Sequence, residues 1–226
     1  MSELSLRLKT IASLVPFGAR VCDVGTDHAR LPIFLKQTGI AKSVIATDLN
    51  EKPIKFAKEN IEKSGATGIS LRLCDGLSAV EKGEADTIII AGIGGEVISK
   101  ILEECDWIES SDITLILQPT TSPEVLRKLL IHKGFGIENE IPLYENGKIY
   151  SIITAKFYGG NTNYPEHFYY IGKVPKTENG IIYIKKQQKR IFDCMNAYKN
   201  IPNKQKEYEL FSKIYLEIEK TLMENT

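Results

Sequence analysis

Short apolar runs that alternate with amphipathic stretches constrain the fold of this chain more than any other feature of the sequence. The runs predict strands near residues 20–25, 43–48, 69–73, 86–91 and 112–117. Helical periodicity predicts a helix before Pro16 and further helices near residues 28–38, 52–64, 95–104 and 122–133. Strands that alternate with helices form a parallel sheet with helices on both faces, because each connecting helix packs back onto the sheet. The sequence therefore predicts the α/β fold class.

After Gly134 this alternation gives way to two extended runs on either side of Asn146-Gly147. An Asn-Gly pair between extended runs is the strongest short-range signal for a β-hairpin. We expect these runs to add an antiparallel pair at one edge of the sheet. Five parallel strands followed by such a hairpin are typical of a Rossmann-like class I methyltransferase sheet, whereas a dinucleotide-binding Rossmann fold continues with parallel units.

The C-terminal part of the chain carries two stripes of mostly apolar residues at heptad spacing. The first stripe is Ile184, Gln188, Ile191, Met195 and Tyr198, and the second is Tyr208, Phe211, Tyr215, Ile218 and Leu222. Pro202 lies between the stripes, so we expect an antiparallel helical hairpin. The sequence therefore predicts two domains, an α/β domain at residues 1–160 and a small helical coiled-coil domain at residues 161–226. A coiled coil that dimerises the chain is the alternative.

Composition limits the classes of protein that the chain can belong to. Basic and acidic residues balance at 29 each, but residues 161–226 hold 11 basic and 8 acidic residues, an excess that a solvated helix face also shows. The apolar runs are far shorter than the roughly 20 residues of a membrane helix, and residues 1–10 lack the core of a signal peptide, so we expect a cytoplasmic protein. The four cysteines and three histidines are scattered, which predicts reduced thiols and no metal site.

Acidic residues and glycines follow the first four predicted strands, at the sheet edge where open α/β folds bind ligands. Asp48 ends the second strand, where an acid accepts hydrogen bonds from ribose hydroxyls. Asp75 follows the third strand and can accept a hydrogen bond from the amine of an adenine. The pattern predicts a nucleoside-cofactor site formed by Asp23, Gly25, Thr26, His28, Asp48, Leu49, Asp75, Gly76, Ala91, Gly92, Gly94 and Gly95. Ordinary turn glycines and helix-capping acids are the alternative interpretation.

The stretch VCDVGTDHARLP, residues 21–32, indicates which cofactor binds. A dinucleotide-binding turn continues from Asp-x-Gly to two further glycines, whereas Asp27 and Ala29 occupy those places here. S-adenosyl-L-methionine has no pyrophosphate, so its binding does not require the three-glycine turn. The stretch therefore argues against NAD and favours S-adenosyl-L-methionine, with a carboxylate close to the methyl group that leaves.

Several motifs together resemble the bacterial tRNA (adenine(22)-N1)-methyltransferase family over nearly the whole chain. They are DVGTDHARLPI, ATDLN, CDGL, GEADTIIIAGIGG and LILQP, with the N-terminal SLRLKTIASLVP and the heptad tail. The resemblance implies a catalytic domain that uses S-adenosyl-L-methionine, a C-terminal coiled-coil domain, and methylation of adenine N1 in the D-arm region of tRNA. Arg7 matches a basic residue near the mouth of the active site. Arg30, Ile93 and Thr120 stand where an aromatic residue, Met and Asn are usual.

Asp27 is the candidate catalytic residue. Adenine N1 already carries a lone pair, and the methylated ring is cationic, so a carboxylate beside it can stabilise the developing charge or accept a hydrogen bond from the exocyclic amine. A helix N-cap at the start of the first crossover helix is the alternative role for Asp27. His28 is interpreted as a packing or capping residue rather than a base.

The expected macromolecular partner is tRNA, and we expect a monomer rather than a dimer. The candidate RNA-binding residues are Arg7, Arg30, Lys185, Lys186, Lys189 and Arg190, of which the last four predict an exposed basic helix face. A methyltransferase for another RNA base or a small molecule would share the cofactor features. A non-catalytic RNA-binding or dimerisation protein would share only the helical tail.

Overall fold

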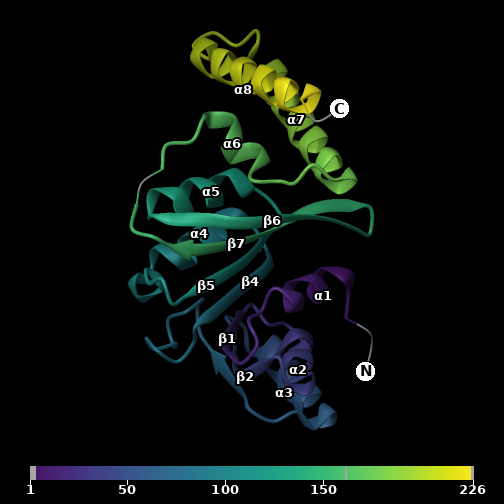
Figure 1. Cartoon of the computed structure of the whole chain (residues 1–226), viewed down its shortest axis with the longest axis vertical. Coiled ribbons are helices and arrows are strands. Elements are labelled where there is room, and N and C mark those ends of the chain that lie inside the picture. The colour runs from purple at the N-terminus through teal and green to yellow at the C-terminus, as the bar shows by residue number, and fades with distance from the viewer. Residues whose placement is uncertain (1–3, 161, 225–226) are drawn as a thin grey trace.

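A seven-stranded sheet with the order β3-β2-β1-β4-β5-β7-β6 runs through the computed structural model, which describes residues 4–160 and 162–224 (Figure 1). The strands are β1 Ala19–Val24, β2 Ala41–Asp48, β3 Ile69–Leu73, β4 Thr87–Ile93, β5 Thr114–Pro119, β6 Phe135–Glu145 and β7 Lys148–Phe157. Strands β1 to β5 are parallel, and β7 pairs antiparallel with both β5 and β6. The predicted parallel sheet and its terminal hairpin at Asn146-Gly147 are confirmed.

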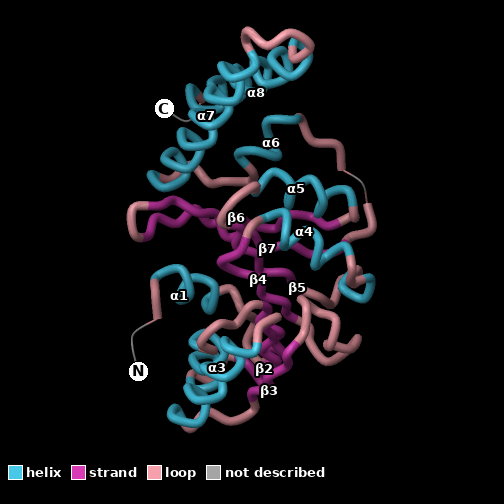
Figure 2. Tube along the Cα trace, turned by 180° about the vertical axis from the view of Figure 1, so that it is seen from behind, coloured by secondary structure: helices cyan, strands magenta, loops and turns pink. Residues whose placement is uncertain are grey.

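Helices cover both faces of the sheet (Figure 2). They are α1 Leu6–Ser13, α2 Arg30–Gln37, α3 Glu51–Ser64, α4 Gly95–Glu103 and α5 Pro123–His132, with a short 3-10 helix at Asp106–Ile108. Side chains alternate between the two faces of a strand, so Ile88 and Ile90 pack with the α4 and α5 side, while Ile89 packs with the α1 and α2 side. Burial on both faces explains why the strands appear as nearly continuous apolar runs in the sequence.

Three helices form the C-terminal part of the chain, namely α6 Glu166–Ile171, α7 Glu178–Tyr198 and α8 Gln205–Met223. Helices α7 and α8 lie side by side as the predicted hairpin (Figure 1). Ile191 and Ile218 are buried between them as expected, but Gln187 rather than Gln188 is buried on α7. The difference arises because α7 packs against β6 and β7 as well as against α8. The predicted domain boundary at residues 160–161 falls between β7 and α6, and residue 161 lies outside the described residues.

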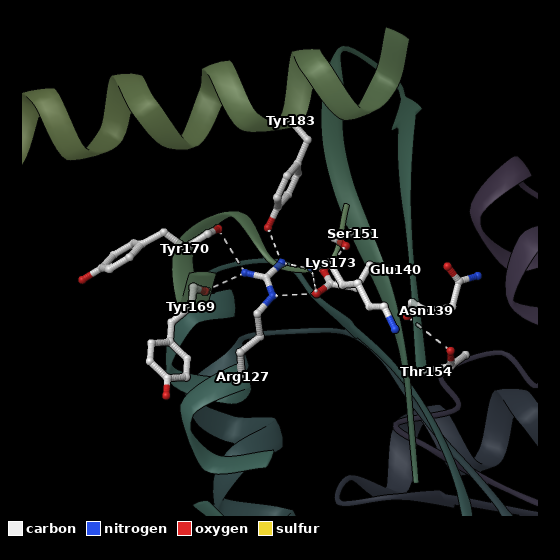
Figure 3. Close-up of polar contacts among 9 residues, drawn as sticks. All are labelled: Arg127, Asn139, Glu140, Ser151, Thr154, Tyr169, Tyr170, Lys173 and Tyr183. Carbon is white, nitrogen blue, oxygen red and sulfur yellow. Dashed lines mark hydrogen bonds and ion pairs between the residues drawn. The ribbon is translucent and has the colours of Figure 1, made fainter. Parts of the chain in front are cut away.

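A buried polar cluster joins these helices to the α/β part of the chain (Figure 3). Arg127 of α5 and Glu140 of β6 form an ion pair at 2.7 Å, and both side chains are fully buried. Arg127 Nη2 donates to the hydroxyl of Tyr183 on α7 at 2.9 Å, and Nη1 donates to the backbone carbonyls of Tyr169 and Tyr170. Burying an ion pair costs several kcal/mol unless the remaining donors and acceptors are satisfied, and these groups satisfy them.

Candidate functional site

The β1–α2 turn is held by its backbone against the end of β2. The amides of Gly25 and Thr26 both donate to the carbonyl of Thr47, at 2.9 and 3.0 Å. Asp27 and Ala29 then adopt positive φ angles of 50° and 53°, where an L-residue costs about 1–2 kcal/mol. Backbone strain of this kind occurs most often at functional sites, and it persists only where the surrounding structure holds the strained residues in place.

The structure excludes the helix-capping role considered for Asp27. Helix α2 begins at Arg30, its N-cap position is Ala29, and no side chain caps it. The Asp27 side chain is 70% exposed, with Oδ2 at 3.6 Å from Nε2 of His28. The carboxylate therefore lies at the open edge of the turn, where an incoming molecule can reach it.

His28 packs against helix α3, in agreement with its interpretation as a packing residue. Its ring lies 5.5 Å from the ring of Phe56, and its carbonyl accepts a hydrogen bond from Asn60 Nδ2 at 3.0 Å. These contacts fix the turn to α3. His28 has been predicted as a cofactor-binding residue as well, and that assignment stays a prediction.

Two carboxyl groups lie buried side by side at the ends of β1 and β2. Asp23 and Asp48 are 6% and 9% exposed. Burial raises the pKa of Asp23 to about 7, and the nearby charge of Asp48 adds to the rise, while the Thr26 side chain opposes it. One oxygen of Asp48 accepts from the amide of Asn50 at 3.0 Å. The pair places strong acceptors at the sheet edge, as the sequence predicts.

This part of the site has unused polar atoms and free space, as a nucleoside cofactor would need. Among the residues that the structure describes, the buried hydroxyl of Thr26 makes no well-aligned hydrogen bond, and its polar neighbour is the Asp23 carboxyl, whose pKa it lowers. A Cβ built on Gly25 would meet no atom within 4 Å. Buried polar groups nearly always have a partner, so a ligand that supplies donors fits here.

The loop after β3 is tied to the same edge. The hydroxyl of Thr47 donates to the carbonyl of Gly76 at 3.0 Å, and the amide of Cys74 donates to the carbonyl of Asp48 at 3.0 Å. Asp75 and Gly76 line a cavity of about 450 Å³. Asp75 is exposed, as is the predicted residue Leu49, which is 62% exposed. The predicted residues of the first three loops therefore meet at one edge of the sheet.

Arg7 of α1 lies over the ends of β4 and β5. Its Nη1 donates to Oε1 of Gln118 at 2.6 Å, and its backbone amide donates to Glu145 at 3.0 Å. A Cβ on Gly92, whose φ is +85°, would lie 3.1 Å from the same Nη1. Arg7 thus stands beside Ala91 and Gly92 at the mouth of the site, where the family resemblance places a basic residue.

Not all of the glycines after β4 that are predicted to bind the cofactor lie next to open space. A Cβ on Gly95 would lie 2.3 Å from the backbone oxygen of Ser122, and the Gly95 amide donates to the Thr121 carbonyl. A Cβ on Gly94 would lie 3.0 Å from the Thr121 hydroxyl. Gly95 is therefore required by packing between two loops of the protein itself, and Gly92 remains the glycine that faces the site.

The four basic residues predicted on α7 do not form one free basic face. Arg190 pairs with Glu124 of α5 at 2.6 Å, and its guanidinium lies over Tyr170. Lys186 donates to the carbonyl of Ile149 at 3.0 Å, and burial lowers its pKa. These two residues contact the α/β part, although Lys186 remains exposed. Lys185 and Lys189 are exposed as well, the latter beside Asp193 at 3.4 Å.

Sequence reasoning missed residues whose role depends on contacts between distant loops. Thr47 connects β2 to the loop after β3, and Gln118 connects β5 to α1. No local pattern distinguishes these two residues from ordinary strand residues. Phe56 is different, because it is an apolar residue on the lysine-rich face of α3, and its i, i+4 relation to Lys52 and Asn60 was a usable signal. Arg30 is exposed at the first turn of α2.

A parallel sheet that ends in an antiparallel hairpin, with carboxyl groups at the ends of β1 and β2, defines a class I methyltransferase. The methyltransferase-domain family matches residues 4–153. The tRNA (adenine(22)-N(1))-methyltransferase of Bacillus subtilis (strain 168) is 33% identical over 226 residues, which cover 95% of each chain. This chain belongs to the tRNA (adenine(22)-N1)-methyltransferase family.

Solved structures agree with this assignment. The crystal structure of the B. subtilis M1A22 tRNA methyltransferase TrmK matches with a TM-score of 0.88 at 29% identity, covering 98% of this chain and 100% of that chain. M. capricolum TrmK in complex with the cofactor product S-adenosyl-homocysteine matches with a TM-score of 0.80 at 29% identity, covering 97% of each chain. The similarity includes the C-terminal helices because it spans nearly the full chain.

Residues 4–160 and 162–224 hold neither a membrane-spanning helix nor a cluster of metal ligands. In this part of the chain, no helix is long and apolar enough to cross a membrane. No group of three or more His, Cys, Asp or Glu side chains is placed to hold a metal ion among these residues.

Proposed function

We propose that this chain transfers the methyl group of S-adenosyl-L-methionine to N1 of adenine 22, in the D-arm region of tRNA. The observation that carries the proposal is the pair of buried carboxyl groups at adjacent strand ends, beside an exposed carboxylate on a strained turn. Similarity over 95% of the chain to a tRNA methyltransferase supports the substrate. We place the enzyme in the cytoplasm as a monomer that uses no metal.

The residues present fit the cofactor. One oxygen of Asp48 accepts a hydrogen bond from the Asn50 amide, and the other can accept hydrogen bonds from a ribose diol. Asp23, once its carboxyl group ionises, can face the cationic amino group of the cofactor. Asp75 is exposed on the loop after β3, where its carboxylate can accept a hydrogen bond from the amine of an adenine. When bound, S-adenosyl-L-methionine supplies an electrophilic methyl group, and the electron pair of the breaking carbon–sulfur bond stays on sulfur.

The protein's part in the reaction is alignment and charge stabilisation. Adenine N1 attacks with its own lone pair, so no proton has to be removed first, and correct positioning supplies much of the rate. The adenine ring becomes cationic as the new bond forms. The Asp27 carboxylate, at the edge of the cofactor turn, stabilises that charge or accepts a hydrogen bond from the exocyclic amine.

The test is methyl transfer from labelled cofactor to a tRNA transcript that carries adenine at position 22. Digestion to nucleosides should yield labelled 1-methyladenosine, and a transcript with guanine at that position should stay unlabelled. Equal labelling of both transcripts would contradict the position, and labelling of neither would contradict tRNA as the substrate. Labelling of a small-molecule fraction instead would favour the alternative methyltransferase class.

A further inference from the structure

A basic groove of about 700 Å³ lies between helices α1, α2 and α3, beside the Asp27 turn. The polar side chains that line it are Lys9, His28, Arg30, Gln37, Asn60, Lys63 and Ser64, and none of its described lining residues is acidic. Lys63 lies 3.9 Å from Glu59 of the same helix. The chain as a whole has as many acidic as basic residues, so the excess of positive charge is a local property of this groove. A groove of one charge attracts a partner of the opposite charge.

An aromatic surface adjoins the groove at its end nearest Asp27. Phe56 is 37% exposed although it is a large apolar side chain, and its ring lies 5.5 Å from that of His28. Lys52 Nζ lies 5.9 Å from the centre of the Phe56 ring. We call Phe56 and His28 the aromatic platform. Exposed rings flanked by cations are the elements that proteins use to bind unpaired nucleotides.

The platform and the groove are continuous. Lys52, Phe56, Asn60 and Lys63 follow one another at i, i+4 and i, i+3 spacing, so they share one face of α3. His28 belongs to both, because its ring packs on Phe56 and its side chain also lines the groove. The same histidine lies 3.6 Å from Asp27. The surface therefore leads directly away from the candidate catalytic carboxylate.

We propose that the platform and groove bind the tRNA strand next to the methylated adenine. The target adenine occupies the space at Asp27, which leaves Phe56 to stack on a neighbouring base. The groove cations Arg30 and Lys63 then contact the phosphates that follow. Stacking and phosphate contacts carry little sequence information, so this surface contributes affinity and register rather than base selection. The inference rests on the proposed function, since it assumes a tRNA substrate.

Replacing the ring tests the platform. Phe56→Ala should weaken tRNA binding about 5- to 150-fold, as expected when one base is no longer stacked, and should leave the dissociation constant of S-adenosyl-L-methionine unchanged. Phe56→Tyr keeps the aromatic face and should restore wild-type affinity for tRNA. The control is Lys58→Gln, because Lys58 is exposed on roughly the opposite side of α3. Binding is measured with the full chain, and thermal unfolding checks that each variant is folded.

Salt dependence tests the groove. Arg30→Gln combined with Lys63→Gln should reduce the slope of log affinity against log salt by about 0.7–0.9 for each phosphate that the variant no longer neutralises, while Lys58→Gln should not change it. If wild-type enzyme methylates tRNA but Phe56→Ala and the double variant bind it with unchanged affinity and slope, this surface is not the tRNA site. If wild-type enzyme fails to methylate tRNA at all, the proposed function itself is wrong.

Discussion

At the residue scale, Asp27 has an unusual combination of exposure and backbone strain. Its side chain is 70% exposed at a φ of 50°, and it does not cap α2. Asp27→Asn should therefore keep the turn and remove the charge, so that S-adenosyl-L-methionine affinity changes little and the single-turnover methylation rate falls about 10²- to 10³-fold. The measurement uses saturating cofactor and tRNA. A wild-type rate in this variant would remove Asp27 from the mechanism.

Asp23 gives the apo protein a pH-dependent stability. Its pKa is about 7 in the folded chain, above the ordinary value of 3.8, so between pH 4 and pH 7 the folded state holds a proton that the unfolded state releases. The free energy of unfolding should therefore fall as the pH rises through this window. Denaturant titrations should show that the contribution is missing in Asp23→Asn. Saturating S-adenosyl-L-methionine should reduce the fall, because a cation beside the carboxyl favours its charged form.

At the scale of elements, the β4–α4 and β5–α5 loops are packed backbone against backbone. Because a Cβ at Gly95 would lie 2.3 Å from the Ser122 oxygen, Gly95→Ala must push the two loops apart. We expect a loss of about 1–3 kcal/mol in the free energy of unfolding, measured with denaturant. Gly160→Ala is the matched control, since a Cβ there would meet no atom within 4 Å. An unchanged stability for Gly95→Ala would mean that the loops are not rigidly packed.

The strands and most helices could be predicted from the sequence, but the short helices α6 and Asp106–Ile108 were not predicted, and contacts between elements were predicted less well. Apolar runs and the Asn146-Gly147 turn were sufficient for the strands, because a buried strand must be apolar and a tight hairpin needs residues that tolerate positive φ. The candidate acids Asp23 and Asp48 could also be placed, because they lie in the last two residues of their strands. Gln187 and Gln188 show the limit, because which one is buried depends on β6 and β7, far away in the sequence.

At the scale of the whole molecule, the helical hairpin is attached through the Arg127 cluster. Tyr183→Phe removes one hydrogen bond to a buried guanidinium, and we expect the free energy of unfolding to fall by about 1.5–3 kcal/mol. Tyr144→Phe, at a residue that is 50% exposed, should have little effect in the same denaturant titration. Equal stabilities of the two variants would show that the Tyr183 hydroxyl contributes nothing to this attachment.

The same cluster affects how the chain folds while it is being synthesised. Strands β6 and β7 precede α7 in the chain and leave the ribosome before it, so until Tyr183 has emerged Arg127 and Glu140 can pair but lack the cover that α7 provides. Domains generally fold during synthesis, starting from the N-terminal side. Here, however, the group that completes the cover of the Arg127–Glu140 ion pair, the Tyr183 side chain, belongs to the C-terminal helix α7. A nascent chain that stops before α7 would keep two charged groups open to water, and the ion pair is covered once Tyr183 of α7 is in place.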